Sequence, residues 1–318
     1  MPALFLSEDD VRELADIDLA LDTVERAFAA LAEGTAHNIP RRRAKSPGIW
    51  LHGMHASAEY LGVSGWKFYT TTKHGAKFHV GLYDNKSGEL IAMIEADELG
   101  RLRTGAASGV ATEAMARLDA SVVGLFGTGR QARTQLQAVC KVRKIERVEV
   151  YSRNAERCAQ FAEEMSELCV TEVVSVHRPD EAAADKDIII TASSAKTPVF
   201  DGRVLVDGTH LNIIGSNSLQ KTEVDAVTVQ QADHIVCDSI EACQLEAGDF
   251  QEALQLGMTD WRLMHDLADV VSGQQTGRAT PEDITLFKSV GLAIEDVALA
   301  KAIYDRAQSE NVGQQLPF

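Results

Sequence analysis

The chain has 318 residues, of which 45% are hydrophobic and 25% charged, a composition that is ordinary for a globular protein and excludes disordered and collagen-like chains. Its formal net charge of −16 repels a phosphate backbone, so nucleic acid is not expected as a partner. A chain of this length folds into one or two domains, and we expect two.

The sequence shows no sign of a membrane or secreted protein. No run approaches the roughly 20 apolar residues that span a bilayer, and no basic segment precedes the apolar start at residues 1–6. We therefore expect a cytoplasmic protein without a membrane partner. The five cysteines are scattered, with no Cys-x-x-Cys pair and no histidine at ligand spacing, so neither disulfides nor a metal site are expected.

The N-terminal third combines a helix with extended segments. Ser7 is a typical helix N-cap with an acidic residue three positions further on, and apolar residues follow with helical spacing until Gly34. From residue 49 to 96 the pattern changes to short extended pieces, and the sequence Asp-Asn-Lys-Ser-Gly at 84–88 predicts a hairpin turn. This third is therefore predicted to be α+β.

The middle of the chain alternates strands and helices. After small residues and helix formers at 103–118, residues 121–126 form a nearly continuous apolar run, which is typical of a buried parallel strand. Such alternation predicts a doubly wound sheet. Residues 284–308 are interpreted as one amphipathic helix interrupted by Gly291. The other predicted elements are strands at 148–151, 188–191, 211–214 and 234–237 and helices at 131–142 and 155–168.

A glycine-rich turn, Gly-Thr-Gly-Arg-Gln-Ala at 127–132, directly follows the apolar run and opens a predicted helix. This strand–turn–helix context is what a dinucleotide-binding turn requires. Gly127 permits the tight turn, Gly129 lets the backbone approach a pyrophosphate, and Ala132 allows close packing of helix on strand. The helix N-terminus offers free N–H groups to the phosphates. We therefore predict a bound nicotinamide dinucleotide.

The end of the next predicted strand bears on the type of cofactor. A site for NAD(H) has an acidic residue there for the ribose hydroxyls, whereas this sequence has Ser152, Arg153 and Asn154. Arginine suits a 2′-phosphate because it forms charge-assisted hydrogen bonds. We therefore prefer NADP(H) over NAD(H), and the alternative is a solvated Arg153 in an enzyme that uses either cofactor.

Three cations in the N-terminal third suit a carboxylate substrate: Arg42, Lys67 and Arg103. Arginine binds a carboxylate through two parallel hydrogen bonds, and the pKa of a desolvated lysine shifts readily. Lys67 stands between Trp66 and Phe68, which favours desolvation. The alternative is that each cation is an ordinary surface charge.

These segments resemble the ornithine cyclodeaminase/mu-crystallin family, and the resemblance runs through nearly the whole chain. The resemblance implies a homodimer. It also implies an α/β protein in which residues 119–292 form a Rossmann domain that binds NAD(P). An α+β domain for substrate binding and dimerisation would comprise residues 1–118, completed by the C-terminal helix at 293–318. The resemblance rests on residues 39–42, 65–67, 102–107, 127–132, 208–215 and 287–296.

The resemblance also implies roles for single residues. Carboxylate binding and proton donation fall on Arg42, Lys67 and Arg103, with a shift of one position to Arg41 left open. The cofactor-binding residues, including those of the glycine-rich turn, are Thr104, Gly127, Gly129, Arg130, Gln131, Ser152, Arg153, Asn154, Thr191, Gly215, Ser216 and Ser289.

One position bears on the reaction. In similar cyclodeaminases an aspartate two residues after the glycine that corresponds to Gly215 takes up protons, and here that residue is Asn217. Asparagine cannot act as a general base. It can orient a substrate or the nicotinamide carboxamide by hydrogen bonds, which suits a reductase. His79 and His55 are alternative proton carriers.

We therefore expect an NAD(P)H-dependent oxidoreductase that interconverts a small α-imino or α-keto acid and an α-amino acid, as ketimine reductases and alanine dehydrogenases do. Lys67, Arg42, Arg103 and Asn217 are its expected catalytic residues. One alternative is an ornithine cyclodeaminase that converts L-ornithine to L-proline and ammonia with bound NAD. The other is a non-catalytic, NADP-dependent small-molecule-binding protein, which would not need three cations around one carboxylate.

Overall fold

The computed structural model describes residues 2–317, which divide into two compact units. The first unit combines the chain up to Thr104 with the segment from Gly291 onward, and the second unit is Gly105–Val290. Helix α3 (Asp97–Met115) begins in the first unit and ends in the second. The boundaries predicted from the sequence follow residues 118 and 292, so the predicted and observed divisions differ mainly in the second half of α3.

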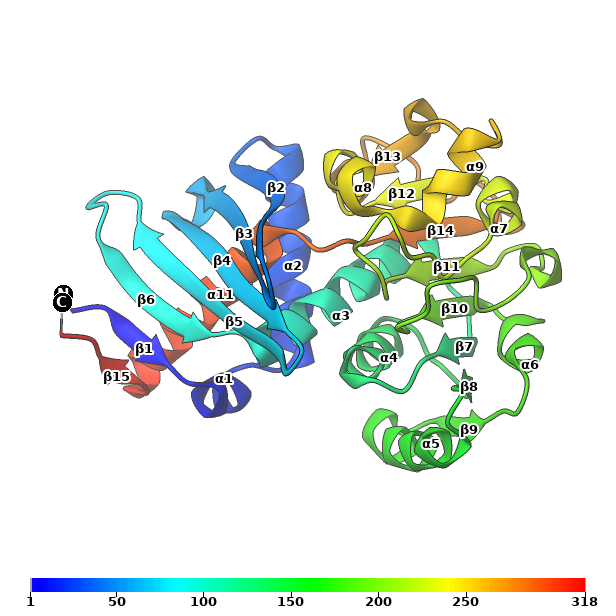
Figure 1. Cartoon of the computed structure of the whole chain (residues 1–318), viewed down its shortest axis with the longest axis horizontal. Coiled ribbons are helices and arrows are strands. Elements are labelled where there is room, and N and C mark those ends of the chain that lie inside the picture. Colours follow the sequence, from blue (N-terminus) through cyan, green and yellow to red (C-terminus); the bar gives the residue numbers. More distant parts are fainter. Residues whose placement is uncertain (1, 318) are drawn as a thin grey trace. The chain divides into compact units, whose positions relative to one another are not determined.

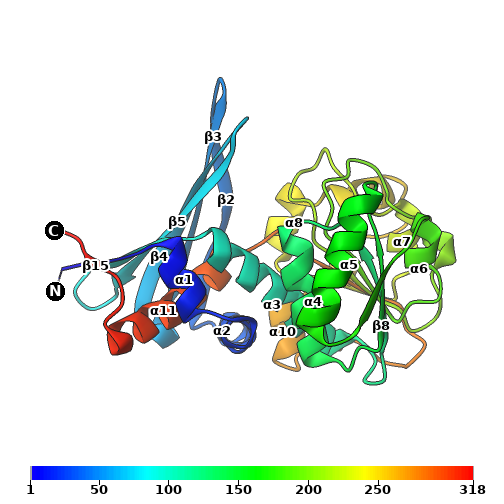
Figure 2. The same cartoon turned by 90° about the horizontal axis from the view of Figure 1, so that it is seen from below.

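The first unit is a sheet of seven strands in the order β15-β1-β6-β5-β4-β3-β2, antiparallel except between β1 and β6. Helices α2 and α11 lie on one face of this sheet (Figures 1 and 2). Its strands are β1 (Leu4–Leu6), β2 (Ala36–Ser46), β3 (Ile49–Ala58), β4 (Val63–Thr72), β5 (Gly75–Asp84), β6 (Leu90–Glu95) and β15 (Gln314–Gln315). Besides the start of α3, its helices are α1 (Glu8–Leu14), α2 (Ile17–Ala32) and α11 (Ala293–Glu310).

The predicted first helix is in fact two helices. Ser7 caps α1 as expected, since its hydroxyl accepts the N–H of Asp10 and the Asp10 carboxylate accepts the N–H of Ser7. A second cap, Asp16, accepts the N–H of Leu19 and starts α2. Apolar residues continue on both sides of the break, so periodicity alone does not reveal it.

The predicted hairpin is confirmed between β5 and β6, which pair antiparallel. The Asp84 carboxylate accepts the N–H groups of Lys86 and Ser87, and Gly88 has a φ of +72°. A short acidic side chain that bonds the following backbone and a glycine with positive φ are the usual means of closing such a turn.

The second unit is a parallel sheet of eight strands in the order β13-β12-β14-β11-β10-β7-β8-β9. Helices cover both faces of this sheet (Figures 1 and 2), which confirms the predicted doubly wound fold. Its strands are β7 (Val122–Phe126), β8 (Arg147–Tyr151), β9 (Glu172–Ser175), β10 (Ile188–Thr191), β11 (His210–Ile213), β12 (His234–Cys237), β13 (Met264–Asp266) and β14 (Thr285–Lys288). Its further helices are α4 (Arg130–Val142), α5 (Ala155–Cys169), α6 (Pro179–Ala183), α7 (Ala226–Gln231), α8 (Ile240–Glu246), α9 (Gln251–Gln255) and α10 (Leu267–Val271).

The order of these strands contains a switch point. The chain runs from β7 outward to β8 and β9, and then returns to place β10 on the other side of β7. Ligands of open α/β sheets bind where the strand order reverses, outside the carboxyl ends of the strands. The expected cofactor site is therefore at the carboxyl ends of β7 and β10.

The interpretation of residues 284–308 as one helix is wrong. Residues 285–288 form β14, which lies between β11 and β12, and α11 begins only at Ala293. Leu286 and Phe287 are fully buried, because both faces of a central parallel strand are covered. A short apolar run of this kind does not alternate, so periodicity cannot separate it from a buried helix.

Among residues 2–317, none of the helices combines the length and the apolar character that crossing a membrane requires.

Candidate functional site

The glycine-rich turn joins β7 to α4. Gly127 has a φ of +114°, and a Cβ atom there would lie 2.5 Å from the backbone oxygen of Ala192, so the turn requires glycine. Gly129 is the N-cap of α4, and a Cβ atom added to it would meet no described atom within 4 Å. Open space therefore lies in front of a helix N-terminus, which is the arrangement that a pyrophosphate requires.

The side chains around this turn also fit a dinucleotide. Gln131 has a buried side-chain oxygen without a hydrogen-bond partner among residues 2–317, and Arg130 is exposed beside it. Ala132 is fully buried and packs in the core that α4 shares with β7 and β8. A buried polar atom without a partner is rare in folded proteins and indicates a missing ligand or water.

Three predicted cofactor-binding residues follow β8. The Ser152 hydroxyl accepts a hydrogen bond from Thr128 of the glycine-rich turn at 3.4 Å. Asn154 caps α5, since its side-chain oxygen accepts the N–H of Arg157 at 2.9 Å. Arg153 is exposed between them. The structure thus assigns Asn154 a local role as a helix cap and leaves Arg153 at the surface beside the turn.

The remaining predicted cofactor-binding residues of this unit follow β10, β11 and β14, at the same edge of the sheet. Thr191, Ser216 and Ser289 are buried, whereas Asn217 is exposed. Because carboxyl ends of parallel strands meet at one edge, the fold gathers these residues with the glycine-rich turn. Thr104 belongs to the first unit, and its hydroxyl donates to the backbone oxygen of Gly100 within α3.

The first unit contains a buried cluster of cations and carboxylates. Lys67 of β4 donates to Asp296 of α11 with a distance of 2.7 Å between Nζ and Oδ1. Arg103 of α3 binds the same oxygen through Nε at 3.0 Å and binds Glu295 through Nη1 at 2.8 Å. Lys67 is 2% exposed, and both carboxylates are fully buried. Asp296 therefore joins the two predicted cations, and Glu295 binds Arg103 alone; sequence reasoning missed both acids.

Burial gives the two cations of this cluster different properties. Burial lowers the pKa of Lys67 to about 8, since the attraction of Asp296 offsets only part of the desolvation. Burial also opposes the charge of Arg103, but Asp296 and Glu295 outweigh it and raise the pKa of Arg103. Lys67 can therefore donate or accept a proton near neutral pH, whereas Arg103 stays charged.

The sequence predicts carboxylate binding by Arg42, but Arg41 and not Arg42 is buried in the structure. A β-bulge between Ile39 and Arg42 inserts one extra residue into β2 and changes which side chains face the helices. Arg41 is therefore buried, and its Nη2 donates to the backbone oxygen of Gly291 at 3.4 Å. Arg42 is exposed. The structure thus places Arg41, and not Arg42, on the face that carries Lys67.

The two histidines considered as proton carriers lie on the opposite face of the sheet. His79 pairs with Phe68 and His55 pairs with Trp66, whereas Lys67 pairs with Met54 and Val80. Successive residues of a strand face opposite sides. His79 and His55 are therefore not beside Lys67.

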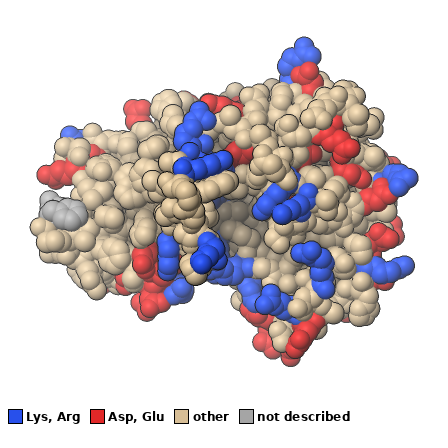
Figure 3. All heavy atoms as spheres, in the orientation of Figure 1, with Lys and Arg blue, Asp and Glu red and all other residues tan. Residues whose placement is uncertain are grey.

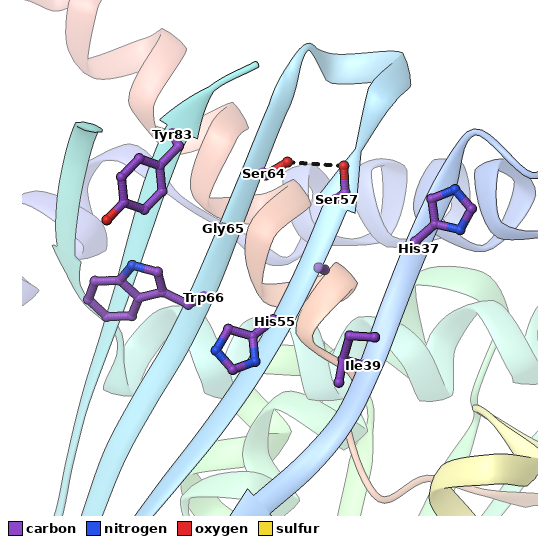
Figure 4. Close-up of a pocket in the computed structure, with 9 residues that line it drawn as sticks. His37, Ile39, His55, Ser57, Ser64, Gly65, Trp66 and Tyr83 are labelled. Carbon is purple, nitrogen blue, oxygen red and sulfur yellow. Dashed lines mark hydrogen bonds between the residues drawn. The ribbon is translucent and has the colours of Figure 1, made fainter. Parts of the chain in front are cut away.

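The outer face of this sheet has a hollow of about 390 Å³ (Figure 4). Trp66 and Tyr83 lie on one side of it and Ile39 on the other, and Ser64 donates to Ser57 at 3.0 Å. Ile39 is 52% exposed and Tyr83 38% exposed. The residues that line the hollow are His37, Ile39, His55, Ala56, Ser57, Ser64, Gly65, Trp66 and Tyr83. This face is therefore rich in exposed apolar side chains.

Charge is unevenly distributed over the surface. Figure 3 shows many lysine and arginine side chains among the acidic ones on the face that it presents. This face therefore presents many positive side chains despite the net charge of −16.

The fold, the turn at Gly127 and the buried cations together define the class of protein, a dinucleotide-dependent oxidoreductase. The model of the ornithine cyclodeaminase/mu-crystallin family matches residues 1–311. The chain belongs to this family.

Three similar proteins each match nearly the whole length of this chain. A Δ1-pyrroline-2-carboxylate reductase of Bacillus cereus is 33% identical, with 99% of this chain and 100% of the relative covered. The solved structure of the Thermococcus litoralis Δ1-pyrroline-2-carboxylate reductase, in complex with NADH and L-proline, is 36% identical. Its TM-score is 0.94, with 98% and 100% of the two chains covered. An archaeal alanine dehydrogenase dimer with bound NAD is 30% identical with a TM-score of 0.94, and both chains are fully covered.

Proposed function

We propose that this protein uses a nicotinamide dinucleotide to reduce a small α-imino acid, or an α-keto acid together with ammonia, to the α-amino acid, and that it also catalyses the reverse oxidation. The observation that carries the proposal is the buried Lys67, whose pKa is lowered to about 8 beside Asp296 and Arg103. Reduction of an imine requires one proton and one hydride. The relatives that act on cyclic imino acids make Δ1-pyrroline-2-carboxylate the first candidate substrate.

In this reaction the cofactor transfers the hydride, and residues of the first unit bind the carboxylate and transfer the proton. The bound nicotinamide supplies or accepts the hydride at the α-carbon. Arg41 and Arg103 provide the positive charge that holds the substrate carboxylate, and Glu295 and Asp296 fix the orientation of Arg103. Lys67, in its charged form, donates a proton to the imine nitrogen, and neutral Lys67 accepts a proton in the reverse direction.

Two alternatives are less well supported. A cyclodeaminase needs a proton carrier at position 217, where this chain has an exposed asparagine. A binding protein without activity does not need a buried lysine with a pKa close to neutral. We therefore place both below the reductase.

The experiment is an absorbance assay with NADH and NADPH against Δ1-pyrroline-2-carboxylate, iminosuccinate, and pyruvate with ammonia. We expect oxidation of the cofactor with at least one of these substrates and no useful release of ammonia from ornithine. Rapid, stoichiometric conversion of ornithine to proline would contradict the proposal, as would the absence of turnover in a protein that binds the cofactor.

We further propose that NADP(H) is preferred over NAD(H). The support is the exposed Arg153 directly after β8, in a segment without an acidic residue. A hydrogen bond to a charged group contributes about 1.5–3 kcal/mol, so Arg153→Ala should weaken NADPH binding at least tenfold and leave NADH binding nearly unchanged. Fluorescence titration measures both affinities, with Arg157→Ala in the exposed first turn of α5 as the matched control. Equal affinities of the unmodified protein for both cofactors would end this proposal.

We also propose that the protein is a homodimer whose partner covers the outer face of the first unit's sheet. Ile39, Trp66 and Tyr83 lie on this face, and the alanine dehydrogenase relative is a dimer. Exposed apolar patches of this kind mark protein–protein interfaces. Sedimentation should give twice the mass of the chain, and Ile39→Glu should shift the protein towards monomer. A monomeric unmodified protein would contradict the proposal.

A further inference from the structure

The second unit contains a fully buried carboxylate, Glu223, that the reaction itself does not use. It lies in the segment between β11 and α7, and its side chain reaches the segments that follow β10 and β11. The predicted cofactor-binding residue Thr191 ends β10, and another, Gly215, lies in the segment after β11. A buried carboxylate is costly unless its oxygens are fully hydrogen-bonded, so its partners show what it holds in place.

Each oxygen of Glu223 accepts one backbone N–H and one hydroxyl. Oε1 accepts the N–H of Ser193 at 2.8 Å and the Ser193 hydroxyl at 2.6 Å. Oε2 accepts the N–H of Gly215 at 2.6 Å and the Thr191 hydroxyl at 2.8 Å. One carboxylate therefore joins the two segments. A Cβ atom at Gly215 would collide with this carboxylate, so the close approach depends on glycine.

A buried ion pair between Asp249 and Lys288 holds the backbone of Glu223. The backbone N–H of Glu223 donates to Asp249 Oδ1 at 2.6 Å, and Asp249 Oδ2 pairs with Lys288 Nζ at 2.7 Å. Lys288 also donates to the backbone oxygen of Ser216 at 2.9 Å. Lys288 and Asp249 are fully buried. The ends of β10, β11 and β14 are thus connected through one network of buried charges.

We propose that Glu223 is a positioning residue for the cofactor: it fixes the segments after β10 and β11 in the form that receives the nicotinamide half of the dinucleotide. This inference rests on the proposed function. Glu223 bonds to the segments after β10 and β11, and among the described residues it has no hydrogen bond to the glycine-rich turn, although Gly127 of this turn packs against the backbone of Ala192. Loss of Glu223 therefore weakens cofactor binding mainly through two loops and leaves the N-terminus of α4 in place.

The test is Glu223→Gln, a change of nearly equal shape. Since both oxygens of Glu223 accept a backbone N–H, either orientation of the glutamine sets its NH₂ group against the N–H of Ser193 or of Gly215. We expect the Kd for NADH to rise at least tenfold. In the cofactor-free protein we expect faster hydrogen–deuterium exchange in the segments after β10 and β11, with unchanged exchange in α4.

A matched control lies at the other end of β10. Asp187 also accepts two backbone N–H groups, those of Ser121 and Val122, but at the amino edge of the same sheet. Asp187→Asn should leave the Kd for NADH unchanged. The proposal is overturned if Glu223→Gln binds NADH with normal affinity, or if its exchange rises equally throughout the second unit, which indicates a purely structural role. Failure of the unmodified protein to bind both NADH and NADPH would instead count against the proposed function, and the exchange pattern would still test the contacts of Glu223.

Discussion

Replacement of Lys67 by methionine is expected to lower kcat by roughly 10²–10⁴-fold, the usual scale for loss of a positioned proton donor. Methionine keeps much of the volume of the lysine stem and removes its charge and its donors. The affinity for NADH should stay nearly unchanged, because the predicted cofactor-binding residues, apart from Thr104, belong to the second unit. Steady-state kinetics and titration with NADH measure these two effects separately.

The control for this variant is Lys77→Met. Lys77 lies on β5 of the same sheet and is exposed, so its removal should leave kcat within twofold of the unmodified protein. An unchanged kcat in Lys67→Met would remove this lysine from the mechanism and leave Arg41 and Arg103 as binding groups only.

Replacement of Asp296 by asparagine is expected to move the alkaline limit of activity to lower pH. In reduction the charged form of Lys67 donates the proton, so activity should fall as the pH rises through about 8, the pKa of this lysine. Asp296 favours the charged form. Without its carboxylate, the pKa of Lys67 falls further and activity is lost at a lower pH. The measurement is kcat/KM as a function of pH, which reports the pKa values of the free enzyme.

The same substitution should also destabilise the fold, because it leaves two buried cations with one acid fewer. Removal of one partner of a buried pair costs about 3–5 kcal/mol, which urea unfolding measures. Glu295→Gln separates the two effects, since Glu295 pairs with Arg103 whereas Lys67 donates to Asp296. It should destabilise the protein similarly while the alkaline limit stays near pH 8. If both variants keep this limit, Asp296 does not control Lys67.

The dinucleotide-binding part of the fold follows from local sequence. A buried strand, Gly127, Gly129 and the start of a helix stand together in the chain, and the steric demands on these glycines are local. The exposed position of Arg42, by contrast, does not follow from local sequence. A strict period of two places Ala36, Pro40 and Arg42 on one face, but the bulge reverses this pattern after Pro40 and turns Arg41 inward. Proline within a strand is the one local signal of such a bulge.

The acids of the cluster were missed for another reason. Glu295 and Asp296 lie in the first turn of α11. Acidic residues at this position are usually exposed and interact favourably with the positive end of the helix dipole. The two acids are buried only because α11 packs on the sheet that carries Lys67, more than 220 residues earlier in the chain. Glu223 is similar, since its partners Thr191 and Ser193 come together with it only through the order of the strands. Such long-range pairings leave no periodic signal in one sequence.

The proposed reaction requires that hydride passes from the nicotinamide to the α-carbon of an imino acid. NADH with deuterium at both C4 positions, incubated with Δ1-pyrroline-2-carboxylate and the protein, tests it directly. We predict proline with one deuterium at its α-carbon, measured by mass spectrometry, and none when Lys67→Met replaces the unmodified protein over the same short interval. Proline without deuterium, or no product from this or any other α-imino acid while NADH is bound, would contradict the claim.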